Sequence, residues 1–347
     1  MDKGKRNSNF EILRIIGIIM ITAYHYNIHG LVDIQDSLVG GGGKFVLLTS
    51  SLWGKAGVNI FSLITGYFMI NRSASFTKLW NLEAQVLFFT IAGLITALVM
   101  GQHVGMMIYI SSIFPIITCS YWFITAYFLV YLFSPYFNKL MFALDGKERD
   151  KFMLILYIVW CIIPFFTNQK ASAFFWNQFI WFVVMYFTGG YLRLNKARYE
   201  KRVYLWAIVI CAFSLVLCSF IIDSIVQQVN VPREAVRYFA WSNSPFIIVI
   251  CVSMLRVAEL SPFKSYKVIN RVSSLVIGMY LFQENVIFSD LCWKVWFDNS
   301  EPITMTGAAL HLFYSIILVC VIGGLAEYVR SVFMNKIIWV CKKQKFL

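Results

Sequence analysis

The hydrophobic residues of this chain fall into long apolar runs separated by short polar segments. Ten runs have the roughly 17 to 25 residues that a helix needs to cross a bilayer. They lie near residues 10–29, 52–70, 79–100, 121–138, 152–167, 174–192, 203–222, 241–257, 272–290 and 307–329. A shorter apolar stretch, 104–118, contains Pro115 and is interpreted as an interfacial or re-entrant segment. The pattern predicts an all-α polytopic membrane protein with about ten transmembrane helices.

Composition agrees with this pattern, because 59% of the 347 residues are hydrophobic and only 14% are charged. Soluble domains carry about 25% charged residues. No polar segment between the runs is long enough for a soluble domain. We therefore expect residues 1–347 to form a single membrane-embedded domain with no appended soluble domain.

The net charge of +13 raises the question of nucleic acid, but the positions of the basic residues argue against it. With the N-terminus inside, the outside segments hold few of the 30 Lys and Arg residues, namely Lys44, Lys170, Arg233, Arg237 and Lys294. Arg14 and Lys55 lie within or at the ends of spans, and all the others are inside. By the positive-inside rule, both termini are predicted to be cytoplasmic in a multi-pass protein of the cell membrane.

The loop between the first two runs contains four consecutive glycines, Gly40 to Gly43. Glycine keeps the backbone free to move, so the loop is interpreted as a flexible connector. A hinge or lid over an external cavity is the alternative.

Four ionisable residues of the first run share one face of the predicted helix. At about 100° per residue, Glu11, Arg14, His25 and His29 fall within a stripe about 60° wide. Such groups at membrane depth cost about 2.5 to 3.5 kcal/mol each, so they usually face a protein interior or a wet cavity. The stripe favours a functional site. A Glu11–Arg14 pair with a structural, hydrogen-bonded His25 is the alternative.

The stripe separates a fixed cation from a proton-transfer group. Arg14 and His25 are about 16 Å apart along the axis, with Arg14 near the cytoplasmic boundary. A guanidinium suits a phosphate group, and an imidazole can act as a general base at neutral pH. His29 follows His25 by one turn and is expected to line the outer mouth. No third ligand is evident for a metal, so no metal site is predicted.

Two further groups of residues lie at predicted span ends. Arg72 and Lys78 follow the second span, where they act as snorkelling anchors, as a basic rim for an anionic cofactor, or as both. Tyr121 and Trp122 begin the fourth span at the external interface, where aromatic belts lie.

The ninth run carries three adjacent polar residues, Gln283, Glu284 and Asn285. Side chains at successive helical positions point in three directions. At least one of them is therefore expected to face an interior cavity.

Four segments together resemble the acyltransferase type three family of integral membrane O-acyltransferases. FEILRIIGIIMITAYHY is similar to the family's first helix, whose signature is an Arg, ten residues and a His, matched here by Arg14 and His25. ITGYFMI resembles the second helix and YWFITAYFLVYLFSPYFN the fourth. GMYLFQENVI resembles a late helix.

The resemblance implies transfer of an acyl group, commonly acetyl, from cytoplasmic acyl-CoA to hydroxyls of cell-envelope polysaccharides or lipid-linked sugars. It implies a catalytic role for His25 together with Arg14, which Glu11 orients. Acetyl-CoA would then bind at Arg14, Arg72 and Lys78. The expected acceptor-binding residues are His29, Tyr121, Trp122, Gln283, Glu284 and Asn285.

The chain departs from the family pattern in two places. Many members have a His where this chain has Gln283, and some have two arginines three apart where this chain has only Arg72 and, six residues later, Lys78. Larger relatives also carry a soluble domain, whose step would here need another protein. Expected partners are membrane lipid, the glycan acceptor and acyl-CoA, with a homo-oligomer or separate glycan-assembly proteins also considered.

Two other functions remain open from the sequence. A proton-coupled transporter or lipid-linked sugar flippase would use Glu11, His25 and Glu284 as a relay. An inactive relative acting as a sensor would be consistent with the glutamine at position 283.

Overall fold

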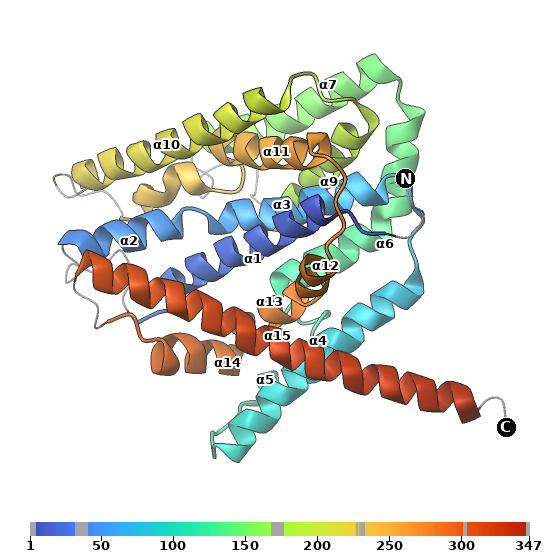
Figure 1. Ribbon diagram of the computed structural model, residues 1–347, viewed down its shortest axis with the longest axis vertical. Coiled ribbons are helices and arrows are strands. Elements are labelled where there is room, and N and C mark those ends of the chain that lie inside the picture. The colour runs from blue at the N-terminus through green and yellow to red at the C-terminus, as the bar shows by residue number, and fades with distance from the viewer. Residues whose placement is uncertain are drawn as a thin grey trace.

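The computed structural model describes residues 5–31, 41–167, 177–226, 228, 233–300 and 304–344 (Figure 1). The chain is 81% helix, and these residues contain no strand, which confirms the predicted all-α class. The helical elements are α1 (Ser8–Ile28), α2 (Gly41–Ser51), α3 (Gly54–Met69), α4 (Phe76–Val99), α5 (Met106–Ile113), α6 (Trp122–Ala143), α7 (Gly146–Tyr157), η1 (Ile158–Ile162), α8 (Ile163–Phe166), α9 (Gln178–Leu194), α10 (Lys201–Val226), η2 (Arg233–Ala240), α11 (Pro245–Leu260), α12 (Lys267–Ser273), α13 (Val276–Glu284), α14 (Val286–Asp290), η3 (Leu291–Trp296) and α15 (Met305–Gln344).

Four helices in the described residues are long and apolar enough to cross a membrane: Phe76–Val99, Lys201–Val226, Ala235–Leu260 and Met305–Met334. A fifth is gained if the bent pair Lys267–Glu284 and Val286–Trp296 is one span. This number is smaller than the ten predicted spans. α3 and α9 are only 16 and 17 residues long, whereas α1 and α6 are longer but carry several buried polar side chains. The apolar helices are consistent with a membrane protein.

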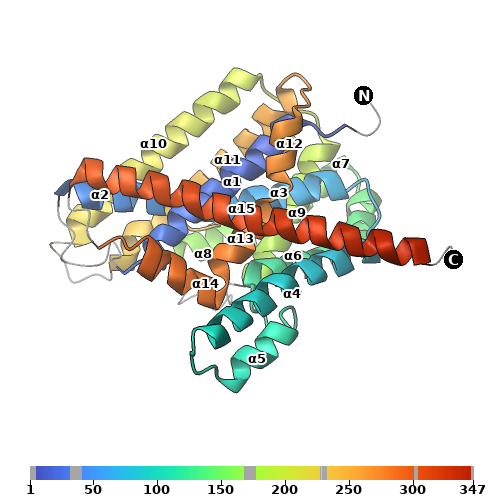
Figure 2. The same ribbon diagram turned by 60° about the horizontal axis from the view of Figure 1, so that its bottom comes forward.

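α1 is the central helix of the fold. It packs against α3, α11, α12, α13 and α15, and it runs through the middle of the bundle in both views (Figures 1 and 2). Any polar side chain on α1 therefore meets protein rather than solvent over most of its length. This placement explains how the stripe residues find partners on distant parts of the chain.

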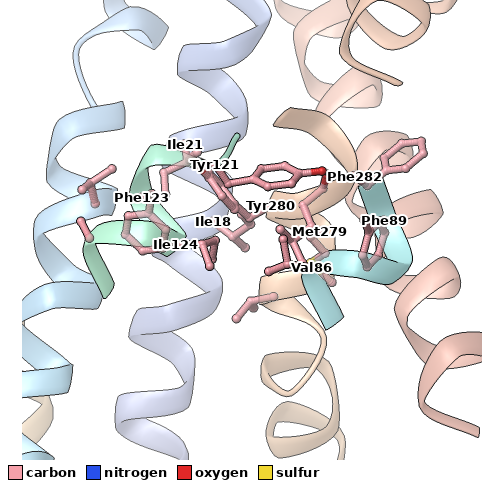
Figure 3. Close-up of a cluster of buried hydrophobic side chains, with 14 of the residues drawn as sticks. Ile18, Ile21, Val86, Phe89, Tyr121, Phe123, Ile124, Met279, Tyr280 and Phe282 are labelled. Atoms are coloured by element: carbon pink, nitrogen blue, oxygen red, sulfur yellow. The ribbon is translucent and has the colours of Figure 1, made fainter. Parts of the chain in front are cut away.

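A hydrophobic cluster fills the space between α1, α4, α6 and α13 (Figure 3). Ile18 and Ile21 contribute from α1, and the rings of Phe123 and Tyr280 meet with their centroids 5.1 Å apart. Ile21 precedes His25 by one helical turn. The apolar cluster therefore ends about one helical turn before the polar end of α1.

α3 and α9 approach each other closely because two glycines lie at their contact. A Cβ atom at Gly66 would overlap the backbone of Tyr186, and one at Gly189 would overlap the backbone of Leu63. Neither neighbour is the end of a flexible side chain. The contact therefore depends on the absence of side chains at both positions.

Replacing Gly66 with alanine is expected to force the two helices apart. Overpacking of this kind costs about 1 to 3 kcal/mol, and more where backbone must move. Thermal unfolding of the purified protein in detergent would measure the loss. The matched control is Gly146→Ala at the start of α7, where a Cβ meets nothing within 4 Å. Equal unfolding temperatures for the two variants would contradict the predicted close contact.

The glycine-rich segment is not simply a flexible connector. Gly41 to Gly43 begin α2, which packs against α1 and α15, and Lys44 forms a 2.7 Å ion pair with Asp223 of α10. Tertiary packing here outweighs the low helix propensity of glycine. A Cβ on Gly42 would collide with Met305, so the glycine is needed for the close approach to α15. Gly40 and residues 32–39 lie outside the described residues.

Two other segments refine the predicted pattern. The stretch 104–118 contains the short helix α5, which lies beside α4 and is tied to it by a 2.8 Å hydrogen bond from Thr90 Oγ1 to the Ser112 carbonyl. Whether it is re-entrant stays a prediction. The last helix, α15, is 40 residues long and continues well past the predicted end at residue 329.

Candidate active site at the C-terminal end of α1

The ninth apolar run is broken where its polar residues occur. α13 ends at Glu284 because Asn285 has an extended backbone, with ψ at 131°, and the chain bends by 74° into the following helices. The Asn285 side-chain oxygen accepts hydrogen bonds from the backbone N–H groups of Ile287 and Phe288 and so caps α14. The sequence interpretation of one continuous helix is wrong here. Asparagine is a favoured N-cap, and this was the available signal for the break.

His25 is buried on α1, and Gln283 of α13 fixes its orientation. The Thr22 hydroxyl donates to the Ile18 carbonyl, so its oxygen is free to accept from Gln283 Nε2 at 3.0 Å. Gln283 Nε2 also donates to the Met279 carbonyl at 3.3 Å. The Gln283 amide oxygen therefore faces His25 Nδ1, 3.2 Å away, and Nδ1 must be the donor.

The other nitrogen of His25 faces a carboxylate. Nε2 of His25 lies 3.1 Å from Glu284 Oε1, and Nε2 of His29 lies 2.9 Å from the same oxygen. The side chain of His29 is 34% exposed, whereas those of Glu284 and His25 are 15% and 9% exposed. The two histidines and the glutamate therefore form one group. His25 and Glu284 are its mostly buried members, and His29 is the member that is accessible to solvent.

This arrangement suits His25 to take up and release a proton. Because Nδ1 is held as a donor, the proton that is exchanged must be on Nε2. When Nε2 is protonated, the imidazolium lies directly against the Glu284 carboxylate. The Glu284 carboxylate therefore favours the charge that a general base acquires and offsets part of the cost of burying that charge.

Lys55 is a member of this site that the sequence reasoning did not assign to it. Its ammonium lies 5.3 Å from the centre of the Tyr24 ring and 6.0 Å from that of Trp122. It is close enough to act electrostatically on both His25 and Glu284. A lysine in the first turn of an apolar run, well away from the basic loops, was the available signal.

Tyr121 and Trp122 play different parts. Tyr121 is 3% exposed, and its hydroxyl donates to the Leu281 carbonyl and accepts from Asn285 Nδ2, each at 3.1 Å. Both hydrogen bonds hold the side chain inside the fold, so Tyr121 faces protein rather than lipid, and its place at the membrane interface stays a prediction. Trp122 lies beside Lys55 and borders the site.

Glu11 and Arg14 lie at the opposite end of α1 from His25. Arg14 donates to Glu11 Oε1 at 2.7 Å, and Ser273 of α12 donates to Glu11 Oε2 at 2.5 Å. Arg14 is 28% exposed and lies near enough to Tyr127 of α6 to interact with it electrostatically. With about 16 Å of helix between Arg14 and His25, the two cannot act on the same proton. Their expected catalytic roles must be separate ones.

A shallow cavity of about 740 Å³ lies at the end of α3 and α6. It is lined by Ile70, Asn71, Arg72, Ser73, Pro135, Asn138, Lys139, Phe142 and Ala143. Asn138 shapes this surface by donating to the Met69 and Arg72 carbonyls at 2.8 and 3.2 Å. Arg72 thus lies in a cavity with a second cation, Lys139. Lys78 is exposed on α4 and is not among the lining residues.

Comparison with known proteins gives one result at the level of the family. No curated protein and no solved structure matches the chain. A family model described as an acyltransferase domain matches residues 7–325, which include α1 and the first half of α15. The match contains His25, Glu284 and every other predicted site residue. Because it spans nearly the whole sequence, the chain belongs to the acyltransferase 3 family.

Proposed function

We propose that the protein transfers an acetyl group from cytoplasmic acetyl-CoA to a hydroxyl of a cell-surface or lipid-linked polysaccharide. The family supports acyl transfer to a hydroxyl-bearing acceptor. The observation that carries the proposal is the hydrogen-bonding of His25, with Nδ1 on Gln283 and Nε2 against Glu284. A histidine held in this way can accept the proton of an attacking hydroxyl.

The proposed reaction has one proton-transfer group. The acceptor hydroxyl approaches on the open side of the site, near His29, and takes the place of Glu284 Oε1 next to His25 Nε2. It gives its proton to Nε2 as its oxygen attacks the thioester carbonyl. A C–O bond forms, the C–S bond breaks, and the proton passes from His25 to the departing thiolate. Glu284 stabilises the imidazolium during this sequence. The positive charge of Lys55 favours the negative charge that develops on the carbonyl oxygen.

The coenzyme is proposed to bind at the other end of α1. Arg14 is partly exposed there, and the cavity of about 740 Å³ contains Arg72 and Lys139. Tyr131 lies between these two places, since its hydroxyl accepts a hydrogen bond from the Ser75 backbone and its ring stacks on that of Tyr127. A phosphate group would interact favourably with either guanidinium.

The proposal includes ten spans in the cell membrane with both termini in the cytoplasm. Two features support it: the excess of Lys and Arg in the inside segments, and the position of the two ends of the fold. The start of α1 and the end of α15 lie on the same side in both views (Figures 1 and 2). Arg14 then lies toward the cytoplasmic side and His25 toward the outer side.

Replacing Arg72 with alanine is expected to raise the KM for acetyl-CoA about tenfold while leaving kcat nearly unchanged, because a guanidinium that binds a phosphate contributes about 1.5 kcal/mol or more. Lys147→Ala is the matched control, since Lys147 is an exposed cation on α7, outside the cavity and not among the expected coenzyme-binding residues. Equal effects of the two substitutions on KM would show that this cavity does not bind the coenzyme.

The decisive experiment for the function has two measurements. Acetyl-CoA is expected to raise the unfolding temperature of the purified protein, and surface polysaccharide from cells lacking the gene is expected to lose acetyl mass. The rival transporter has no use for acetyl-CoA. Its proposed relay is also interrupted, since Glu11 lies about 21 Å from His25 along α1. Absence of both effects would rule out the acetyl-transfer proposal.

A further inference from the structure

The two histidines and the glutamate at the end of α1 also have the composition of a metal site. His25, His29 and Glu284 each place one ligand atom within 4.8 Å of the other two. The sequence suggested the His pair at i, i+4 but offered no third ligand, because Glu284 is 255 residues away from His29. The break after α13 supplies it.

The two distances from Glu284 Oε1 to the histidine nitrogens are close to those of a tetrahedral zinc site. With bonds of about 2.0 to 2.1 Å, two ligands of tetrahedral zinc are about 3.3 to 3.4 Å apart. Glu284 Oε1 lies 3.1 Å from His25 Nε2 and 2.9 Å from His29 Nε2. The two histidine nitrogens lie within 4.8 Å of each other, so small rotations of the side chains would bring the three atoms around one ion, with a fourth position open.

The surroundings of His25 are those of a metal ligand. Zinc-binding histidines usually donate their second ring nitrogen to an oxygen, which fixes the tautomer and directs the free nitrogen at the ion. Gln283 Oε1 accepts from His25 Nδ1 in this way, and Gln283 is itself held by Thr22 and Met279. The partly exposed side chain of His29 provides an access path.

We propose that His25, His29 and Glu284 bind a divalent transition-metal ion of the zinc class through Nε2, Nε2 and Oε1. Imidazole and carboxylate ligands suit Zn²⁺, which accepts three protein ligands and an open fourth position. The ion occupies the same Nε2 lone pair that accepts the proton during acyl transfer. Zinc therefore inhibits the enzyme reversibly; this inhibition, unlike the binding itself, rests on the proposed function.

The positive charge of Lys55 is expected to lower the affinity of this site for a metal ion. Its ammonium acts electrostatically on His25 and Glu284, and a second positive charge beside them opposes the arrival of a cation. Removing the lysine charge should therefore tighten metal binding. This effect is opposite in direction to that of a damaged fold, which makes Lys55→Met an informative variant.

The test measures metal binding directly on the purified full-length protein. Titration with Co²⁺ as a spectroscopic probe, followed by displacement with Zn²⁺, is expected to give one site per chain with nitrogen and oxygen ligands. His29→Ala and Glu284→Gln should each weaken binding about 100-fold or more, since each removes one of three ligands. Lys55→Met should tighten it. His103→Ala, in the exposed segment before α5, should leave it unchanged.

The outcomes of the binding measurements decide whether the metal site exists, independently of acyl transfer. A cobalt spectrum with thiolate bands, from the free cysteines, would place the metal elsewhere. Unchanged affinity in His29→Ala, or no binding at micromolar metal, would overturn the site. If the metal binds as expected but Zn²⁺ leaves acetyl transfer unaffected, the site stands and the role of His25 as base fails.

Discussion

Replacing His25 with alanine is expected to abolish acyl transfer while the protein still accumulates in the membrane. In the proposed mechanism His25 supplies the atom that accepts the hydroxyl proton, and a positioned general base contributes about 10² to 10⁴ in rate. The measurements are the kcat for acetyl transfer from acetyl-CoA in the purified protein and the acetyl content of surface polysaccharide in cells. Both should fall to the background of a strain without the gene.

The matched control is His103→Ala, because His103 is an exposed histidine in the segment before α5. It should retain wild-type activity and wild-type amounts of protein. His25 is not a member of the hydrophobic cluster between α1, α4, α6 and α13. The thermal unfolding of His25→Ala should therefore stay cooperative. Wild-type acetyl transfer by His25→Ala would falsify the assignment of the base.

The site on α1 was predictable because it depends on one helix. The spacing of Glu11, Arg14, His25 and His29 can be read from a single periodicity, and the structure gives all four of them polar partners. The interpretation of Glu11 as the partner of Arg14 is confirmed by a 2.7 Å ion pair. These features are local, so no knowledge of tertiary packing was needed.

The partners of His25 were not predictable in the same way. Gln283 and Glu284 reach His25 only because α13 packs beside α1 and then ends at Asn285. Sequence periodicity carries no information on which helices pack together. Lys55 was missed for the same reason, since its position beside the site depends on the contact between α1 and α3.

The membrane topology was predicted in more detail than the fold supports. Counting apolar runs gave ten spans, but several of the corresponding helices are short or contain buried polar residues. Helices that surround a polar site can be poor in apolar residues because protein, rather than lipid, covers them. α10 shows the opposite case, with only 11% of its apolar window buried inside the protein.

The contacts of Gln283 change how its departure from the family pattern is interpreted. From the sequence it was a departure from the histidine of many relatives, and it raised the idea of an inactive protein. In the fold its amide oxygen accepts the Nδ1 proton of His25. In the proposed mechanism Gln283 positions His25, so the glutamine at this place does not by itself indicate a sensor.

Replacing Glu284 with glutamine is expected to have the second-largest effect on acyl transfer. The change keeps the size of the side chain but removes the charge that lies 3.1 Å from His25 Nε2. At an effective dielectric constant near 20, such a charge stabilises the imidazolium by up to about 4 kcal/mol. Allowing for remaining solvent and rearrangement, kcat should fall about 30-fold to 1,000-fold. The KM for acetyl-CoA should change little, because the proposed coenzyme site is at the other end of α1.

Asp290→Asn is the matched control, because Asp290 is an acid only six residues away whose ion pair with Lys294 is largely exposed. Its loss should leave both kinetic constants near those of the wild type. Glu284→Asp adds a test of geometry, since it keeps the charge but withdraws it by one methylene group. Its activity should lie between that of the wild type and that of Glu284→Gln. A Glu284→Gln enzyme with normal kcat would mean that the imidazolium is stabilised by another group, and would leave His25 acting without a carboxylate partner.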